Sequence, residues 1–120
     1  GNFSTDKKID ALAKLGFYMQ TNPEIIQKYG GRLVDYNTAR SFLDGEFSGS
    51  DESKTKFFNE IWESGLLVGG VKEGELCRFL HLTIQEYLTA RAIKTKLDEK
   101  EFTVGGFIDK YVRYEDKIFS

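Results

Sequence analysis

Apolar residues recur at helical spacing in the first quarter of the chain. Positions 9, 12, 13, 16 and 19 are apolar or small, which predicts a helix over Asp6–Gln20 with Asp6 as its N-cap. A second, short helix is predicted over Pro23–Tyr29, because proline is tolerated in a first helical turn and Gly30-Gly31 can end the helix. The chain therefore opens with two consecutive helices.

Two further helices are predicted before residue 65. A helix from Tyr36 to Phe42 or Leu43 follows Asp35, a residue type that caps helices well, and Gly45–Ser53 is a polar loop. Asp51 or Ser53 then opens a helix that runs to Ser64. This helix carries a wide apolar stripe, which we expect to pack in the core; it consists of Phe57, Phe58, Ile61 and Trp62.

The pattern then changes from helical to extended. Leu66–Val68 and Leu76–Leu80 are short β-prone runs with a glycine-containing connector between them, which predicts a hairpin. Helical spacing returns after the hairpin and continues to about Leu97. A last helical segment, Phe102–Tyr114, contains two glycines and is expected to start irregularly.

These elements predict a mainly α fold with a small β-hairpin. Helices followed by a two-stranded wing favour a winged-helix-like helical bundle, with a C-terminal helical segment after it. We assign residues 2–97 to the winged-helix domain and residues 98–120 to the truncated start of a following helical region. We interpret Gly1 as an expression scar, so the chain is expected to be a piece of a longer protein.

Composition narrows the choice of partners. The 17 basic and 19 acidic side chains are evenly mixed, so no strong field attracts nucleic acid or an anionic membrane, and a protein partner is favoured. Cys77 is the single cysteine, which excludes an internal disulfide and fits a reducing compartment; we expect it to fill the core. No apolar run approaches the roughly 20 residues of a membrane span, so a cytoplasmic location is expected.

The most informative stretch is the junction between the hairpin and the next helix, where the chain carries its only histidine, His81. Thr83 and Glu86 have the spacing of a capping box, and Leu82 with Tyr87 that of a hydrophobic staple around it. A helix that starts here would present its first N–H groups beside His81, an arrangement that favours a bound anion. The sequence therefore predicts phosphate recognition at His81, supported by Thr83 and Glu86.

The stretches Ser64–Val68 and Arg78–Ala90 also carry a family resemblance. The second stretch reads RFLHLTIQEYLTA, and it resembles the winged-helix region that follows the nucleotide-binding core in NACHT-type signalling NTPases of the STAND class. The family pattern is an aromatic residue, one further residue and histidine, then an aromatic or aliphatic residue before Gln-Glu-Tyr/Phe and Leu/Phe, and then alanine. The chain departs from it at Ile84, where phenylalanine is common, and at Thr89, where alanine is common.

The resemblance implies a regulatory function. In the family this histidine lies against the β-phosphate of ADP in the resting state, so the resemblance assigns that contact to His81. The implied partner is the nucleotide-binding core of the same polypeptide, a P-loop ATPase that uses ADP or ATP with magnesium and can oligomerise when activated. The fragment itself needs no cofactor and releases the core when ATP drives activation.

Two other functions are less well supported by the sequence. A DNA-binding winged helix is the alternative, but the helix ending at Ser64 lacks the clear basic surface that phosphate contacts need, so nucleic acid is an unlikely partner. An enzyme is not expected, because the fragment has no Gly-rich loop followed by Lys-Ser or Lys-Thr and no clustered metal ligands. With a single histidine, most acid–base schemes also have no partner.

Overall fold

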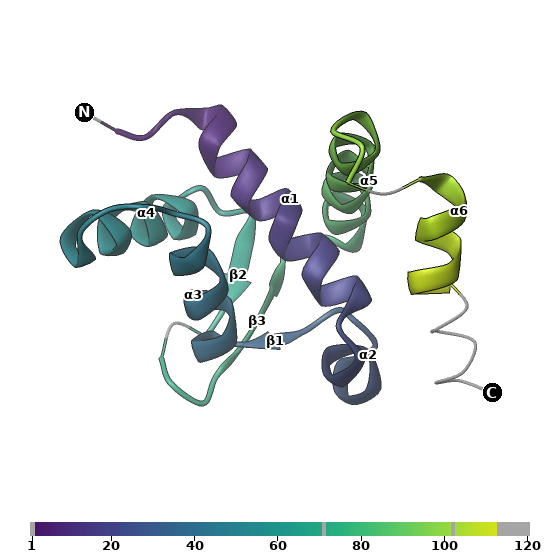
Figure 1. Cartoon of the computed structure of the whole chain (residues 1–120). Helices are drawn as coiled ribbons and strands as arrows, with labels where there is room; N and C mark the ends of the chain where they lie inside the picture. Colours follow the sequence, from purple (N-terminus) through teal and green to yellow (C-terminus); the bar gives the residue numbers. More distant parts are fainter. Residues whose placement is uncertain (1, 71, 102, 113–120) are drawn as a thin grey trace.

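A computed structural model of the chain describes residues 2–70, 72–101 and 103–112. Within these ranges the fold is mainly helical with a small antiparallel sheet, which confirms the predicted fold class (Figure 1). The elements in chain order are α1 (Thr5–Thr21), α2 (Pro23–Tyr29), β1 (Val34–Asp35), α3 (Tyr36–Gly45), α4 (Asp51–Glu63), β2 (Leu67–Gly69), β3 (Leu76–Phe79), α5 (Leu82–Asp98) and α6 (Val104–Phe107), followed by a π-helical turn (Ile108–Val112).

The first two helices begin and end at residues of the expected chemistry. Ser4, not Asp6, caps α1, because the helix starts earlier than predicted and the Ser4 hydroxyl accepts a hydrogen bond from the Lys7 N–H. The short helix α2 has the predicted bounds, and it ends at Gly30, whose φ of 63° places it in the left-handed region.

The start of α3 and the loop after it are as predicted, but the loop is not polar throughout. The Asp35 carboxylate caps α3 by accepting hydrogen bonds from the Thr38 N–H at 3.0 Å and the Thr38 hydroxyl at 2.7 Å. The segment predicted as a polar loop from Gly45 buries the ring of Phe47 against the core. This loop is therefore part of the packed interior and not only a connection.

The sheet contains the predicted hairpin and one additional strand. β2 and β3 pair antiparallel, with Leu67 opposite Phe79 and Val68 opposite Arg78. β1 pairs with the other side of β3, with Val34 opposite Cys77, so the strand order is β1-β3-β2. The hairpin is thus joined by backbone hydrogen bonds to the segment that leads into α3.

Helix α1 lies at the centre of the molecule, with α3 and α4 on one side of it and α2 and α5 on the other (Figure 1). Its buried residues supply a large part of the core: Ala11, Leu12, Ala13, Leu15, Gly16, Phe17 and Met19. Side chains from α3, α4 and the sheet complete this core, and Leu43, Phe57, Ile61 and Leu67 among them are almost fully buried. One hydrophobic core therefore serves all the long helices.

The last predicted helix is only partly described. Phe102 and Tyr114, its predicted ends, lie outside the described residues. Between them, α6 and the π-helical turn bring the ring of Tyr111 to 5.2 Å from the ring of Phe17 in α1, in an edge-to-face contact. Among the described helices, none combines the length and the apolar character that a membrane crossing requires.

Candidate functional site

His81 lies at the turn between β3 and α5 and is the N-cap of α5. Its backbone is extended, with φ −136° and ψ 146°, and its carbonyl oxygen accepts from the N–H groups of Ile84 at 3.1 Å and Gln85 at 3.3 Å. The side chain is exposed, and its imidazole makes no hydrogen bond or ion pair with any residue that the structure describes. Both ring nitrogens are thus available to a group from outside the chain.

The predicted capping box at Thr83 and Glu86 is wrong. Helix α5 begins at Leu82, so Thr83 already lies within the first turn, and no side chain among the described residues caps the helix. Leu82 and Tyr87, predicted to form a staple, are 37% and 66% exposed. The reason is that His81, and not Thr83, occupies the N-cap position, and within the described residues its imidazole makes no capping hydrogen bond to the first N–H groups of α5.

Arg78 contributes a cation to this turn. Its Nη1 donates to the carbonyl oxygens of Phe79 at 3.1 Å and Leu80 at 2.9 Å, the two residues that precede His81. The guanidinium therefore holds the backbone of the turn in place. Sequence reasoning gave Arg78 no role, because a charged residue in an exposed strand position has no distinguishing local pattern.

Exposed apolar side chains surround His81. Leu80 is 40% exposed, and Leu82 and Tyr87 are exposed as well. A neighbouring apolar groove between α1 and α5 is lined by Ile9, Leu66, Thr83, Ile84, Tyr87, Leu88 and Arg91. Exposed apolar side chains together with an apolar groove are typical of a contact site for another protein domain.

Gln85 is the second residue of the motif that lies at this turn, and its role is internal. It is 2% exposed, and its Nε2 donates to the carbonyl oxygen of Gly31 at 2.7 Å. This bond joins α5 to the loop between α2 and β1. Gln85 therefore fixes the position of the helix and is not accessible to a ligand.

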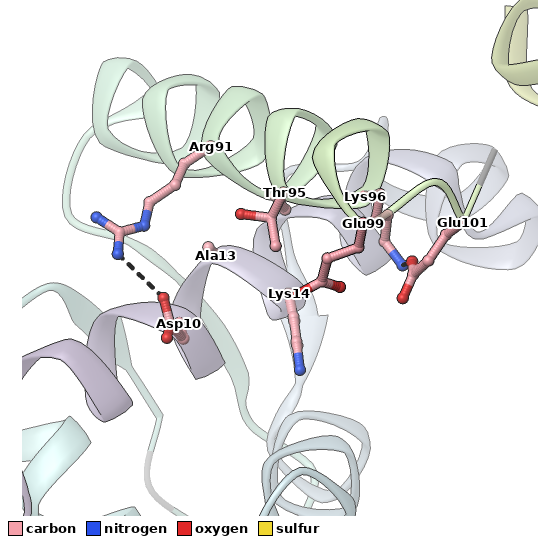
Figure 2. A pocket seen from close by; sticks show the side chains of 9 residues that line it. Asp10, Ala13, Lys14, Arg91, Thr95, Lys96, Glu99 and Glu101 are labelled. Carbon is pink, nitrogen blue, oxygen red and sulfur yellow. Dashed lines mark hydrogen bonds and ion pairs between the residues drawn. The ribbon is translucent and has the colours of Figure 1, made fainter. Parts of the chain in front are cut away.

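A second groove lies between α1 and the C-terminal half of α5 (Figure 2). Its walls carry cations and anions in equal number: Lys14, Arg91 and Lys96 against Asp10, Glu99 and Glu101. Arg91 Nη2 donates to Asp10 Oδ1 at 3.0 Å, and Lys96 Nζ lies 3.0 Å from Glu101 Oε2. Because the charges balance, this groove has no preference for either an anion or a cation.

Cys77 is a buried thiol and not an activated nucleophile. Burial raises the pKa of the Cys77 thiol to about 11, with a further contribution from the negative charges of Asp35 and Glu75, so the reactive thiolate is scarce near neutral pH. Cys77 is fully buried in β3, as predicted, and its thiol donates to the carbonyl oxygen of Gly70. In the described part of the chain, no three His, Cys, Asp or Glu side chains are grouped as metal ligands.

Comparison with known proteins assigns no function to this site. No family model, no curated protein and no solved structure matches the chain.

Proposed function

We propose that the chain is the non-catalytic regulatory winged-helix domain of a NACHT-type signalling NTPase, and that His81 contacts the β-phosphate of ADP in the resting state. The ADP belongs to the nucleotide-binding core of the same polypeptide, a P-loop ATPase that also binds ATP and magnesium. In this proposal the domain stabilises the closed, ADP-bound form and releases it when ATP favours the open form, which is a shift in population. The protein acts in the cytoplasm, and the activated form can oligomerise.

The observation that carries the proposal is the exposed, unpartnered imidazole of His81 at the start of α5. A buried histidine with both nitrogens bonded internally could not reach a phosphate. Here the ring is exposed, the first turn of a 17-residue helix lies directly after it, and no side chain caps that turn. A helix start of this kind favours an anion through its free N–H groups and its dipole.

Two further features support contact with a neighbouring domain. Leu80 and Leu82 flank His81 in the sequence and are both exposed, so a domain that packed around this turn would cover apolar surface as well. The order of elements, with the β2–β3 hairpin after α4, agrees with the winged-helix arrangement that the sequence predicts. A phosphate contact and an apolar contact would then form together.

The DNA-binding alternative receives less support. Helix α4, the helix that would enter a DNA groove, carries four acidic residues, Asp51, Glu52, Glu60 and Glu63, against two lysines. Such a helix repels phosphate, while duplex binding depends on basic side chains that neutralise phosphates. Salt-sensitive binding of the chain to a DNA duplex in a mobility-shift assay would favour this alternative and argue against ours.

The proposal is tested by His81→Ala in the protein that contains both this domain and its nucleotide-binding core. Loss of a hydrogen bond to a charged phosphate is expected to speed ADP release by about tenfold or more and to raise basal signalling. Lys94→Ala, on the exposed side of the same helix, is the matched control and should leave ADP release unchanged. Equal ADP release from His81→Ala and the parent protein would contradict the proposal.

A further inference from the structure

The face of the sheet that points away from the core carries exposed leucines. Burial alternates along β3, so that every second residue faces the core while Leu76 and Arg78 face outward. Leu80 continues this alternation, because its N–H donates to the Leu66 carbonyl oxygen at 2.9 Å and extends the pairing of the two strands. Leu76 is 38% exposed and Leu80 40% exposed. One exposed leucine therefore lies on each side of Arg78 along the strand.

A third apolar side chain lies across the sheet from Arg78. Val68 of β2 is directly opposite Arg78 in the antiparallel pair, and it is partly exposed. Residues opposite each other in such a pair project to the same face and lie within contact distance. Apolar side chains thus surround the cation on three sides. We refer to Val68, Leu76, Arg78 and Leu80 together as the outward sheet face.

The Arg78 guanidinium is engaged on one side only. Its Nη1 donates to the carbonyl oxygens of Phe79 and Leu80, which fixes the orientation of the planar group. Among the described residues, its Nε and Nη2 have no hydrogen-bond partner, and no carboxylate forms an ion pair with it. These two nitrogens form the fork that binds both oxygens of a carboxylate side by side. The guanidinium is therefore pre-organised for a carboxylate from outside the chain.

The acidic residue of the three strands does not neutralise Arg78. Asp35 of β1 is opposite Leu76, but its two carboxylate oxygens accept from the N–H and the hydroxyl of Thr38, at 3.0 and 2.7 Å. It is thus engaged as the cap of α3. When a partner removes water from the outward sheet face, the positive charge at its centre requires a counter-charge that the partner supplies.

We propose that the outward sheet face docks a partner protein domain whose contact surface is apolar and carries a carboxylate at its centre. The apolar rim of the face provides burial, and the carboxylate compensates the desolvated guanidinium. A second copy of the chain does not have this chemistry. Two equivalent faces in a two-fold pair bring Arg78 against Arg78, and like charges oppose association. The inference concerns the sheet and does not depend on the contact proposed for His81.

The inference is tested with the Arg78→Glu variant of the same chain as the probe, because this variant presents the same apolar rim around a carboxylate. Labelled parent chain titrated with the unlabelled variant should show NMR shift changes in residues 66–69 and 76–80. This association should be at least about tenfold tighter than self-association of the parent chain, and high salt should weaken it. Arg32→Glu, the same charge change at an exposed loop position, is the matched control and should not associate with the parent.

A second variant tests the same face if Arg78→Glu does not fold. Arg78→Leu removes the charge that opposes pairing of two copies, so it should dimerise in sedimentation velocity runs at concentrations where the parent chain is monomeric. Leu76→Ser in the same chain should restore the monomer.

Three results would overturn the inference. They are an Arg78→Glu mixture no tighter than the parent alone, an Arg78→Leu chain that stays monomeric, and a parent chain that pairs with itself through this face. The last result would identify a second copy as the occupant. None of these measurements bears on the His81 contact, which is measured by ADP release.

Discussion

The region around α4 and the region around α5 are held by different kinds of side chain. Around α4, aromatic rings pack in succession. The ring centres of Phe3 and Phe47 lie 5.0 Å apart, those of Phe47 and Phe57 5.0 Å apart, and those of the stacked Phe58 and Trp62 5.9 Å apart. The buried face of α5 has no aromatic residue at all. Aromatic rings bury large areas and favour specific geometries, so ring packing is expected to contribute more to the stability of the first region, and small and aliphatic side chains more to that of the second.

Each region has a cation above a ring. Near α4, the Arg40 guanidinium lies 4.5 Å from the centre of the Phe58 ring and donates to Thr55 Oγ1 at 2.9 Å, so it joins α3 to α4. At α5, the Lys96 ammonium lies 5.1 Å from the centre of the Phe17 ring of α1, and the pair of Asp10 and Arg91 is open to solvent. A cation above a ring restrains the two helices that it joins, whereas an exposed ion pair contributes little.

The largest expected effect comes from removing a ring of the α4 region. Phe57 is 1% exposed and contacts both Phe3 and Phe47, so Phe57→Ala should lower the free energy of unfolding by about 3 to 5 kcal/mol. Urea denaturation followed by circular dichroism measures this loss. A decrease below about 1 kcal/mol would mean that the aromatic cluster is not what stabilises this region.

A smaller effect is expected from the polar anchor of α5. Gln85→Leu removes the donor to the Gly31 carbonyl oxygen and leaves that oxygen without its partner, which should cost about 1 to 3 kcal/mol. Glu86→Leu, at the exposed neighbouring position, is the matched control and should change stability by less than about 0.5 kcal/mol. If both variants were equally stable in urea, the Gln85 bond would not anchor the helix.

The smallest of the three effects concerns the cap of α3. Asp35→Ala should lower the free energy of unfolding by about 1 kcal/mol at neutral pH, a typical value for a lost N-cap. Asp35→Asn should lose less, because its amide oxygen can still accept from the Thr38 N–H.

The same cap predicts a pH dependence. Hydrogen bonds from the Thr38 hydroxyl and then the Thr38 N–H hold the pKa of Asp35 below its ordinary value of 3.8. A lowered pKa in the folded state means that this contribution is fully present above the ordinary pKa and is lost as the pH falls through the folded-state pKa. As the pH is lowered from 6 to 2, the midpoint temperature of thermal unfolding should therefore fall less steeply for Asp35→Asn than for the parent chain. Parallel declines would exclude Asp35 as a contributor.

Local signals were sufficient for much of the fold. Pro23 and Gly30 mark both ends of α2, and Asp35 marks the start of α3, because each acts on backbone groups within a few residues. The two residues of β1 have no such signal. Val34 and Asp35 are extended because they pair with Cys77 and Leu76, about forty positions later, and a sequence pattern cannot display that pairing.

The candidate site was predicted in part. The location of His81 at the start of a helix followed from the change of pattern, but the roles of Thr83 and Glu86 did not hold, since the helix begins at Leu82. Gln85 was the least predictable residue. A glutamine within an amphipathic helix is normally exposed, and its burial depends on a carbonyl oxygen of Gly31, which comes from a distant loop.

The position of β3 between β1 and β2 has a mechanical consequence. Because β3 is bonded on both sides, it cannot be displaced without pulling on Val34 at one edge and Val68 at the other. Asp35 follows Val34 and caps α3, so tension applied where β3 ends would be passed along the strand to the base of α3. The small sheet therefore connects the turn at His81, through its backbone hydrogen bonds, to α3 on the opposite side of the molecule.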